Sequence, residues 1–337
     1  MSTLEQDIRR AAALLGEAKD ITLLGHVRPD ADALGSALAL GRVLQQRGAT
    51  VRVSFAAPAE VPETLRGLDV GGLVVPPGQL PDTEPLLVAL DTPTLSRLGH
   101  LGERVARNKD AGGEVLVVDH HASNMSYGTH HVVDETAEAT AVLVLHLIDA
   151  LGAELDEPIA RCLYAGLVTD TSGFRRATPS THHMAARLLE AGVDPDLVVR
   201  RIVDDHPFAW LPMLSTVLAG TRLEPDAAQG FGLVHAVVRR DVARGVRAEE
   251  VESVIDVVRS TRDAGVAVVL KEAEPAEHGS VWQVSMRSVG KVDVSMAARA
   301  LGGGGHRLAA GCTVEGTADQ VLDIVRDAVE EAPLLAG

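Results

Sequence analysis

The feature that most constrains the fold is the alternation of short apolar runs with helical patterns in the first half of the chain. In one example, Leu34, Leu38 and Leu44 follow an apolar run at helical spacing, and Gly48 is placed to end that helix. Such alternation predicts a mostly parallel sheet with helices on both faces. The first part of the chain is therefore expected to be α/β. Its apolar runs are at 21–25, 50–55, 70–75, 86–91 and 114–119.

The later segments change character. Helical patterns at 135–152, 156–170 and 179–192 continue the first part, and strand and helix patterns mix after residue 226. We therefore expect a first domain at 1–192, a helical connector at 193–226 and a smaller α/β domain at 227–337. In the last of these, the expected strands are 231–240, 266–273, 281–288 and 309–316, and the expected helices are 248–261, 292–302 and 317–332.

Composition sets limits on the class of protein. The 337 residues are 46% hydrophobic and 2% aromatic, which predicts two domains with cores of Leu, Val, Ile and Ala. No apolar run approaches the roughly 18 residues that cross a bilayer, so a soluble, cytoplasmic protein without a membrane partner is expected. Cys162 and Cys312 are far apart in apolar contexts, which favours neither a disulfide framework nor a zinc site. The net charge of −16 argues against a protein that coats long nucleic acid.

The stretch GHVRPDADALGS places His26, Asp30 and Asp32 in the turn between the first apolar run and its helix. The carboxyl end of a strand is where open α/β sheets place ligand sites. An aspartate before a helix is also a common N-cap, and Asp30 or Asp32 suits that role. Three ionisable groups in one short turn nevertheless favour a divalent metal such as manganese.

Other acidic and histidine residues stand at the ends of apolar runs. Asp91 closes LLVALD, Asp119, His120 and His121 close EVLVVDHH, and Asp170 lies in YAGLVTDT. Parallel strands end along one edge of a sheet, so these groups are expected to share one cleft with the first turn. Their carboxylates would repel one another unless cations were bound. Two divalent ions resolve that repulsion and suit phosphoryl transfer.

With these motifs in view, the chain resembles the DHH phosphoesterase family. GHVRPDADALGS, the aspartate of ALDTP, VVDHHASN and GLVTDTSGF match its four motifs, and GGGGHRLAAG matches the glycine-rich signature of the DHHA1 companion domain. The resemblance is greatest to the short two-domain branch of nanoRNases and 3′-phosphoadenosine 5′-phosphate (pAp) phosphatases, whose actinobacterial members also cleave cyclic di-AMP or pApA.

The resemblance implies a set of site residues. One metal would be held by His26, Asp30 and Asp91, and the second by Asp32, Asp91, His120 and Asp170. Manganese is the expected ion, with magnesium and cobalt as alternatives. His121 would face the scissile phosphate, and Asp119 would orient a histidine.

Further residues are implied to bind substrate. The substrate is expected between the two domains, at Asn124, Arg175, Arg287, Ser288, Gly303, Gly304, Gly305, His306 and Arg307. Between Val281 and Gly311 four Lys or Arg accompany a single acid, which forms the basic face that a terminal phosphate needs. The segment TDTSGFRR departs from TDTGSFR, which is usual in the resembled family, and Leu308 stands at a position where that family frequently has an asparagine.

Several histidines are interpreted as having no role in the chemistry. The pairs His130-His131 and His182-His183 are expected to be solvated on a loop or helix face, and His146 is expected in the core or at an interface.

The resemblance predicts a homodimeric hydrolase acting on pAp, two- to five-nucleotide RNA, pApA and cyclic di-AMP. An inorganic pyrophosphatase, a processive single-strand exonuclease and a non-catalytic nucleotide sensor are the alternatives. The GGGGH motif disfavours the first, the length and charge disfavour the second, and the complete set of ligand residues disfavours the third.

Overall fold

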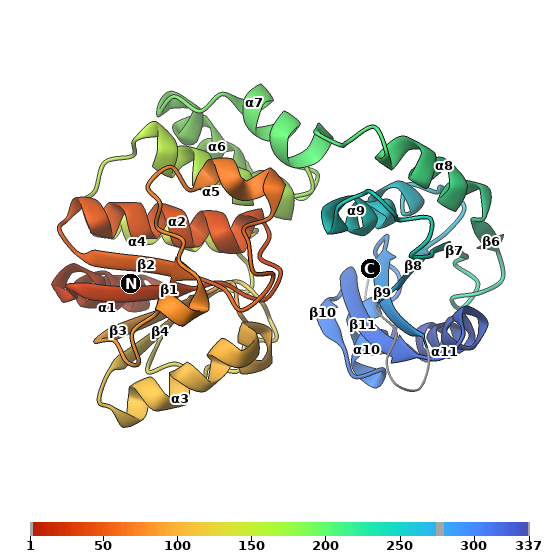
Figure 1. Ribbon diagram of the computed structural model, residues 1–337, viewed down its shortest axis with the longest axis horizontal. Helices are drawn as coiled ribbons and strands as arrows, with labels where there is room; N and C mark the ends of the chain where they lie inside the picture. Colours follow the sequence, from red (N-terminus) through yellow and green to blue (C-terminus); the bar gives the residue numbers. More distant parts are fainter. Residues whose placement is uncertain (1–2, 274–279, 336–337) are drawn as a thin grey trace. The chain divides into compact units, whose positions relative to one another are not determined.

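The computed structural model describes residues 3–273 and 280–335. The chain divides into two compact units, Met1–Asp205 and His206–Gly337 (Figure 1). The division falls inside residues 193–226, the expected connector. That segment contains the helix α7 (Pro195–Val199), the π-helical turn η4 (Arg200–Asp204), α8 (Trp210–Ala219) and the strand β6 (Arg222–Glu224).

The first unit is built on a five-stranded sheet in which all strands are parallel. The strands lie in the order β2-β1-β3-β4-β5, so the direction of winding reverses between β1 and β3. The predicted α/β class with a parallel sheet is confirmed. The strands are β1 (Asp20–Leu24), β2 (Thr50–Ser54), β3 (Leu86–Leu90), β4 (Glu114–Asp119) and β5 (His130–Val133).

Helices cover both faces of this sheet because its strands are apolar on both sides. Alternate residues such as Leu23 and Val88 pack with the helices α1, α2, α4 and α5, whereas Leu24 and Leu87 pack with η3 and α3 (Figure 1). Each buried leucine contributes about 1.5–3 kcal/mol. The helices of the first unit, besides α7 and η4, are α1 (Thr3–Glu17), α2 (Ala31–Gln46), η1 (Glu63–Leu68), η2 (Pro77–Gln79), η3 (Leu95–Gly102), α3 (Glu103–Asp110), α4 (Thr140–Ala150), α5 (Glu157–Asp170) and α6 (Pro179–Glu190).

Two expected elements differ in the structure. The apolar run 70–75 forms no strand of the sheet, and only an isolated bridge joins Val74 to Val53. Asp69 accepts hydrogen bonds from the amides of Leu73 and Val74, which holds this run in a turn. The helix expected from residue 135 begins at Thr140.

One interpretation of the histidines was wrong. His130 and His131 belong to the edge strand β5 rather than to a loop or helix face, and Glu114 lies 3.1 Å from Nε2 of His130. His146 is exposed on α4, so it lies outside the core, and its place at an interface stays a prediction. In a short edge strand that is half-exposed, polar residues replace the apolar pattern by which strands are recognised.

The second unit contains a six-stranded mixed sheet in the order β10-β11-β9-β8-β7-β6, in which only β7 and β8 pair in parallel. One face packs on α10 and α11 around Trp282, and the other packs on α8 and α9 around Val269. This smaller α/β domain was predicted. Its elements after β6 are β7 (Leu233–Val238), α9 (Ala248–Val258), β8 (Val266–Glu272), β9 (Val281–Ser288), α10 (Val294–Ala300), β10 (Gly304–His306), β11 (Ala309–Glu315) and α11 (Ala318–Glu330).

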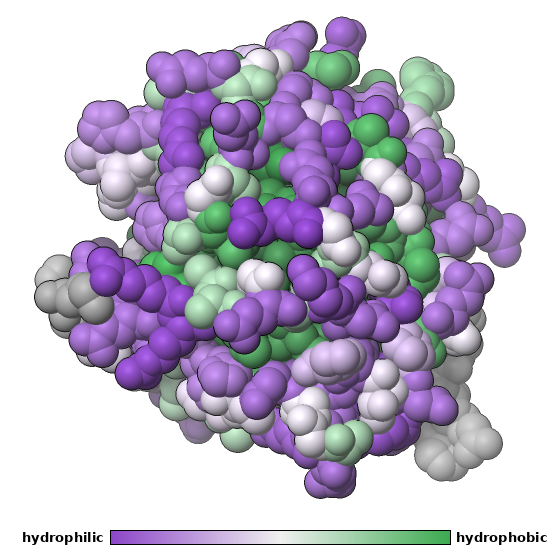
Figure 2. Space-filling model, turned by 90° about the vertical axis from the view of Figure 1, so that its left-hand side faces the viewer, coloured by the Kyte–Doolittle hydropathy of each residue, from purple (hydrophilic) through white to green (hydrophobic). Residues whose placement is uncertain are grey.

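The surface of the first unit seen in Figure 2 is mostly hydrophilic, with hydrophobic residues visible in patches between polar side chains. Within residues 3–273 and 280–335, every helix is too short or too polar to cross a membrane. Cys162 and Cys312 are both buried free thiols.

Candidate metal centre

The polar residues predicted from strand ends meet at one edge of the first sheet. His26 follows β1, Asp91 follows β3 and Asp119 is the last residue of β4. The winding of the sheet reverses between β1 and β3, and the crevice at such a reversal is the usual ligand site of open α/β folds. The order of the strands therefore places the motif residues where a ligand is expected.

Asp91 lies at the centre of this group. Its Oδ2 atom is 3.4 Å from Nε2 of His26, and its Oδ1 atom is 3.5 Å from Nε2 of His120 and 3.5 Å from Nδ1 of His121. Its backbone adopts a left-handed φ of 55°, which is uncommon outside glycine and is concentrated at functional sites. The two oxygens of one carboxylate thus face two different clusters.

The first cluster contains His26, Asp30 and Asp91, whose ligand atoms lie within 4.8 Å of one another. Nδ1 of His26 lies 2.8 Å from the carbonyl of Val27, which requires a proton on Nδ1, so Nε2 is an acceptor whenever the ring is neutral. That Nε2 atom is buried and makes no hydrogen bond to any residue that the structure describes. In the neutral ring this buried acceptor is directed at the carboxylates of Asp30 and Asp91, which fits a cation bound among them.

Asp30 combines the two roles considered for it. Its Oδ1 atom accepts hydrogen bonds from the amides of Asp32 and Ala33 and so caps α2. Its Oδ2 atom lies 3.5 Å from Nε2 of His26. One oxygen is used for the helix, and the other is available to the cluster.

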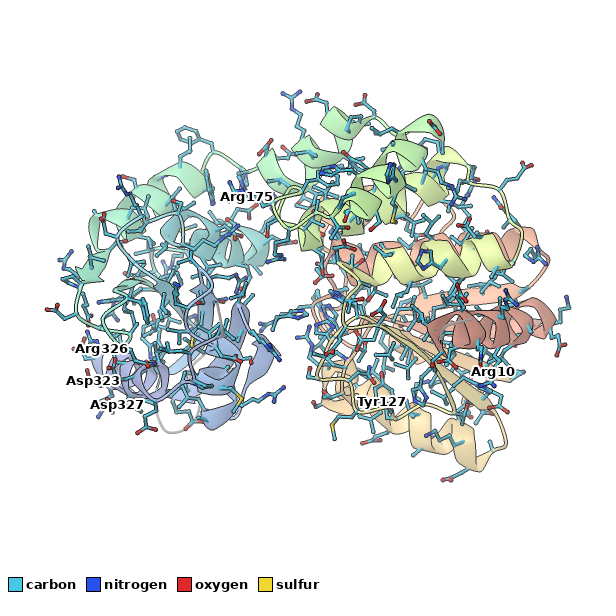
Figure 3. All side chains as sticks on the ribbon, turned by 180° about the vertical axis from the view of Figure 1, so that it is seen from behind. Arg10, Tyr127, Arg175, Asp323, Arg326 and Asp327 are labelled. Atoms are coloured by element: carbon cyan, nitrogen blue, oxygen red, sulfur yellow. The ribbon has the colours of Figure 1, made fainter. Side chains whose placement is uncertain are left out.

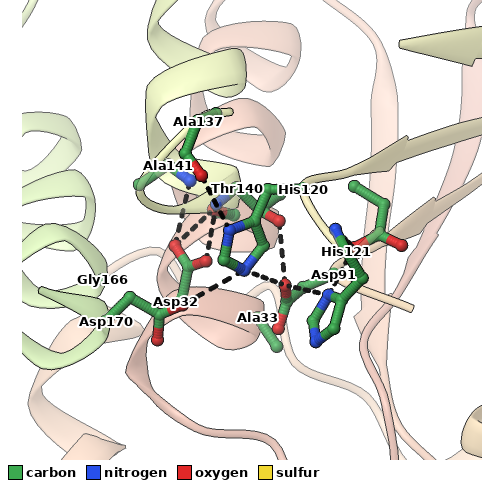
Figure 4. Close-up of polar contacts among 12 residues, drawn as sticks. Asp32, Ala33, Asp91, His120, His121, Ala137, Thr140, Ala141, Gly166 and Asp170 are labelled. Atoms are coloured by element: carbon green, nitrogen blue, oxygen red, sulfur yellow. Dashed lines mark hydrogen bonds and ion pairs between the residues drawn. The ribbon is translucent and has the colours of Figure 1, made fainter. Parts of the chain in front are cut away.

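The second cluster contains Asp32, Asp91, His120 and Asp170 (Figure 4). Nδ1 of His120 lies 3.1 Å from the carbonyl of Ala137, and Nε2 lies 3.1 Å from Oδ2 of Asp170. Asp170 is the last residue of α5, where the helix dipole disfavours a negative charge. A cation at this point would stabilise both the carboxylate and the helix end.

The pKa values show how strongly the clusters favour positive charge. Burial would lower the pKa of His26, but the carboxylates of Asp30 and Asp91 raise it to about 10. His120 behaves in the same way, because Asp170, Asp32 and Asp91 outweigh burial and raise its pKa to about 10.

Two of the carboxylates, Asp32 and Asp170, show the same deficit of positive charge, because their pKa values are raised. Burial and the charges of Asp170 and Asp91 raise the pKa of Asp32 well above its usual value. Divalent ions would supply the missing charge, and ligand deprotonation accompanies metal binding.

His121 is held by a separate set of contacts. Its Nδ1 atom lies 2.7 Å from Oδ1 of Asp119, and the side-chain amide of Asn124 donates to Oδ2 of Asp119 at 2.6 Å. Asp119 is fully buried, so its carboxylate fixes the orientation of the imidazole ring. The orienting role of Asp119 stays a prediction, which this contact supports. Asn124 contacts this carboxylate, and its role in substrate binding stays a prediction.

Several supporting residues were missed by the sequence reasoning. The carboxylate of Asp32 accepts hydrogen bonds from the amides of Thr140 at 2.7 Å and Ala141 at 2.9 Å, at the start of α4. Gly166 on α5 leaves the space that Asp32 occupies. Neither Thr140 nor Gly166 carries a signal in a single sequence, because small residues in apolar helices are ordinary.

The remaining predicted residues occupy several elements. Arg175 is exposed in the segment between α5 and α6 (Figure 3), and Arg287 is half-buried on β9. Ser288 is buried, and its hydroxyl accepts a hydrogen bond from the amide of Val292. His306 and Arg307 are exposed at and just after the end of β10.

The glycines of the GGGG run differ in what surrounds them. A Cβ on Gly303 would lie 2.1 Å from the carbonyl oxygen of Gly311, and one on Gly305 would lie 2.5 Å from that of Ala309. Close packing of β10 on β11 therefore accounts for these two glycines. A Cβ on Gly304 would meet nothing within 4 Å, so Gly304 is the one of the three predicted substrate-binding glycines, 303 to 305, that packing does not explain.

Comparison with known proteins agrees with the fold and the motifs. Residues 20–167 match the DHH family, N-terminal domain, and residues 230–332 match the DHHA1 domain. A bifunctional oligoribonuclease and PAP phosphatase NrnA of Thermus thermophilus is 34% identical over 322 residues, covering 94% of this chain and 91% of that protein. A cyclic-di-AMP phosphodiesterase GdpP of Geobacillus thermodenitrificans is 25% identical over 313 residues, covering 87% of this chain and 44% of that one.

A solved structure shows the same fold over the whole chain. An exopolyphosphatase-related protein from Bacteroides fragilis superposes with a TM-score of 0.86 at 22% identity and covers 98% of both chains. The two domain matches and the relative from Thermus thermophilus together decide the family. The chain belongs to the DHH family of hydrolases and carries a DHHA1 domain after its DHH domain.

Proposed function

We propose that this protein is a phosphoesterase that hydrolyses short oligoribonucleotides, including pApA, and removes phosphate from pAp, with two divalent metal ions as cofactors. The observation that carries the proposal is the position of Asp91, whose two carboxylate oxygens face His26 on one side and His120 on the other. A carboxylate shared in this way suits a pair of ions. The relative of 34% identity, named as an oligoribonuclease and PAP phosphatase, supports the choice of substrates.

The residues that would hold the ions follow from the two clusters. His26, Asp30 and Asp91 would hold one ion, and Asp32, Asp91, His120 and Asp170 would hold the other. Imidazole with carboxylate oxygens suits manganese first, with magnesium and cobalt as alternatives. When bound, such a pair lowers the pKa of water and neutralises charge on the phosphate.

The side chains outside the two clusters would position the substrate and move a proton. His121 would use Nε2 to stabilise the scissile phosphate or to give a proton to the leaving oxygen, because its Nδ1 is held by Asp119. Asp119 would keep the ring in that orientation and would stabilise its protonated form. Arg287, His306 and Arg307 would bind the part of the nucleotide that does not react.

Cyclic di-AMP is a second candidate substrate. The cyclic-di-AMP phosphodiesterase of Geobacillus thermodenitrificans aligns with 87% of this chain. The chain spans less than half of that relative, so cyclic di-AMP is proposed only as an additional substrate. We also propose the homodimer implied by the family resemblance, which sedimentation of the purified protein would measure.

The deciding experiment is a chromatographic turnover panel with manganese present and then chelated. The substrates are pAp, pApA, cyclic di-AMP, RNA of two to five nucleotides and pyrophosphate. Manganese-dependent release of mononucleotides from pApA and short RNA would support the proposal. Turnover of pyrophosphate alone would favour a pyrophosphatase, and tight nucleotide binding without turnover would favour a sensor.

A further inference from the structure

The segment before and at the start of α4 contacts three of the assigned ligands without supplying one. This segment, Ala137 to Ala141, is here called the α4 lead-in. The carbonyl of Ala137 lies 3.1 Å from Nδ1 of His120, and the amides of Thr140 and Ala141 donate to the carboxylate of Asp32 (Figure 4). All of these contacts are made with the second cluster.

Thr140 makes two of the contacts by itself. Its backbone amide donates to Oδ2 of Asp32 at 2.7 Å, and its hydroxyl donates to Oδ1 of Asp91 at 2.9 Å. Oδ1 is the oxygen of Asp91 that faces His120. Thr140 is fully buried. Removing its hydroxyl would leave the carboxylate of Asp91 without a donor that water could easily replace, and that loss costs free energy. A single residue thus sets the separation between two carboxylates, one on α2 and one after β3.

The lead-in is itself fixed from the other side. Oε1 of Glu138 accepts hydrogen bonds from the hydroxyls of Thr178 at 2.5 Å and Thr181 at 2.6 Å, at the start of α6. Thr178 and Thr181 form the capping box of that helix. The backbone between Glu138 and Thr140 is therefore anchored to an element outside the cluster, which gives the hydroxyl of Thr140 a defined position.

We propose that Thr140 is a positioning residue for the second metal, holding Asp91 and Asp32 at the spacing that a bound cation requires. This inference rests on the proposed two-metal function. It assigns to the hydroxyl a role that the backbone amide does not supply, because only the hydroxyl contacts Asp91. Outer contacts of this kind contribute to metal affinity although they do not touch the ion.

The test compares Thr140→Val with Thr140→Ser, and uses Thr136→Val as the matched control. Valine keeps the shape of threonine and the backbone amide but removes the hydroxyl, whereas serine keeps the hydroxyl. Thr136 is exposed in the same loop, and its hydroxyl donates to Asp134, outside both clusters. Manganese affinity is measured by calorimetry and by the loss of the free-ion signal in electron paramagnetic resonance, and melting temperatures are recorded with and without manganese.

We expect Thr140→Val to weaken one class of manganese site about 10- to 100-fold, with lower turnover at limiting manganese. Thr140→Ser is expected to stay within a few-fold of the natural protein, and Thr136→Val to match it. Equal losses in the valine and serine variants would overturn the role of the hydroxyl. A valine variant that melts earlier without metal yet binds manganese normally would show a purely structural role and would also overturn it.

The same measurements separate this inference from the proposed function. A natural protein that binds no manganese and cleaves no nucleotide refutes both. A natural protein that binds manganese and is active, with a Thr140→Val variant of equal affinity, refutes only the role of Thr140.

Discussion

Gly166 on α5 faces Asp32 on α2 so closely that a Cβ atom on the glycine would lie 2.5 Å from Oδ1 of the aspartate. On the same pair of helices, a Cβ on Gly35 would lie 2.4 Å from the carbonyl oxygen of Cys162. The two helices therefore approach through glycine at two points. This close approach brings Asp170, at the end of α5, toward the carboxylate of Asp32, and the charge of Asp170 is the strongest electrostatic influence on the pKa of Asp32 after burial.

Gly166→Ala is expected to displace Asp32 or to separate α2 from α5, and so to weaken manganese binding. Overpacking of this kind costs about 1–3 kcal/mol of folding stability. The measurements are thermal unfolding without metal and manganese titration. Gly78→Ala is the control, because a Cβ there meets nothing within 4 Å. Unchanged affinity and stability in Gly166→Ala would mean that the helices adjust without moving the carboxylate.

Removal of divalent ions is expected to abolish turnover, because only cations would hold the carboxylates of the two clusters together. Added manganese should restore activity better than calcium, which prefers larger shells of oxygen ligands. Product release is measured by chromatography after chelation and after each addition. Full activity in excess chelator would refute the two-metal proposal.

Asp91→Asn is expected to reduce turnover of pApA by about a thousandfold or more, because both clusters lose one shared charge and metal-activated water contributes at least that much. Circular dichroism checks that the variant is folded. Asp91 should be at least as sensitive as a residue of one cluster only, such as Asp30. Near-normal turnover in a folded Asp91→Asn protein would remove the shared carboxylate from the mechanism.

Arg287→Ala and His306→Ala are expected to leave the manganese content of the protein unchanged and to weaken turnover of pApA and short RNA. Binding energy from remote groups positions the reacting phosphate, so substrates with a second nucleotide should suffer most. A minimal phosphate ester serves as the comparison substrate. If both variants lose manganese, or lose the ester and the dinucleotide equally, neither residue acts in recognition.

In the second unit, the environment of Glu250 makes the free energy of unfolding depend on pH. Burial would raise the pKa of Glu250, but hydrogen bonds and charge from Arg247 lower it below its usual value. A carboxylate with a lowered pKa contributes stability above its unfolded pKa and loses that contribution as the pH falls through the folded value.

Glu250→Gln should therefore reduce the free energy of unfolding at pH 7 by about 1–3 kcal/mol and lower the melting temperature. The difference in melting temperature from the natural protein should shrink toward pH 3. His206 lies 3.7 Å from the same carboxylate, so the comparison includes His206→Ala. A difference that stays constant between pH 7 and pH 3 would show that the charge of Glu250 does not stabilise the fold.

Much of the fold follows from local patterns that a single sequence contains. Apolar runs such as 86–91 become strands because their residues are buried on both faces, and Gly48 ends α2 in a left-handed conformation. The motif residues His26, Asp91 and Asp119 could be assigned to strand ends for the same reason. Because parallel strands end at one edge, their convergence was also predictable.

What the sequence by itself determined is therefore the class of the fold, its family and the identity of the polar residues at the strand ends. Tertiary structure alone decided which atoms meet. Asp32 and Thr140 are 108 residues apart, and the hydroxyl of Thr140 reaches Asp91 only because α4 begins beside both carboxylates. The space that Gly166 leaves for Asp32 likewise depends on how closely α2 and α5 pack. Periodicity and turn chemistry act over a few residues, whereas these contacts depend on how whole helices pack on the sheet, and no local pattern records that packing.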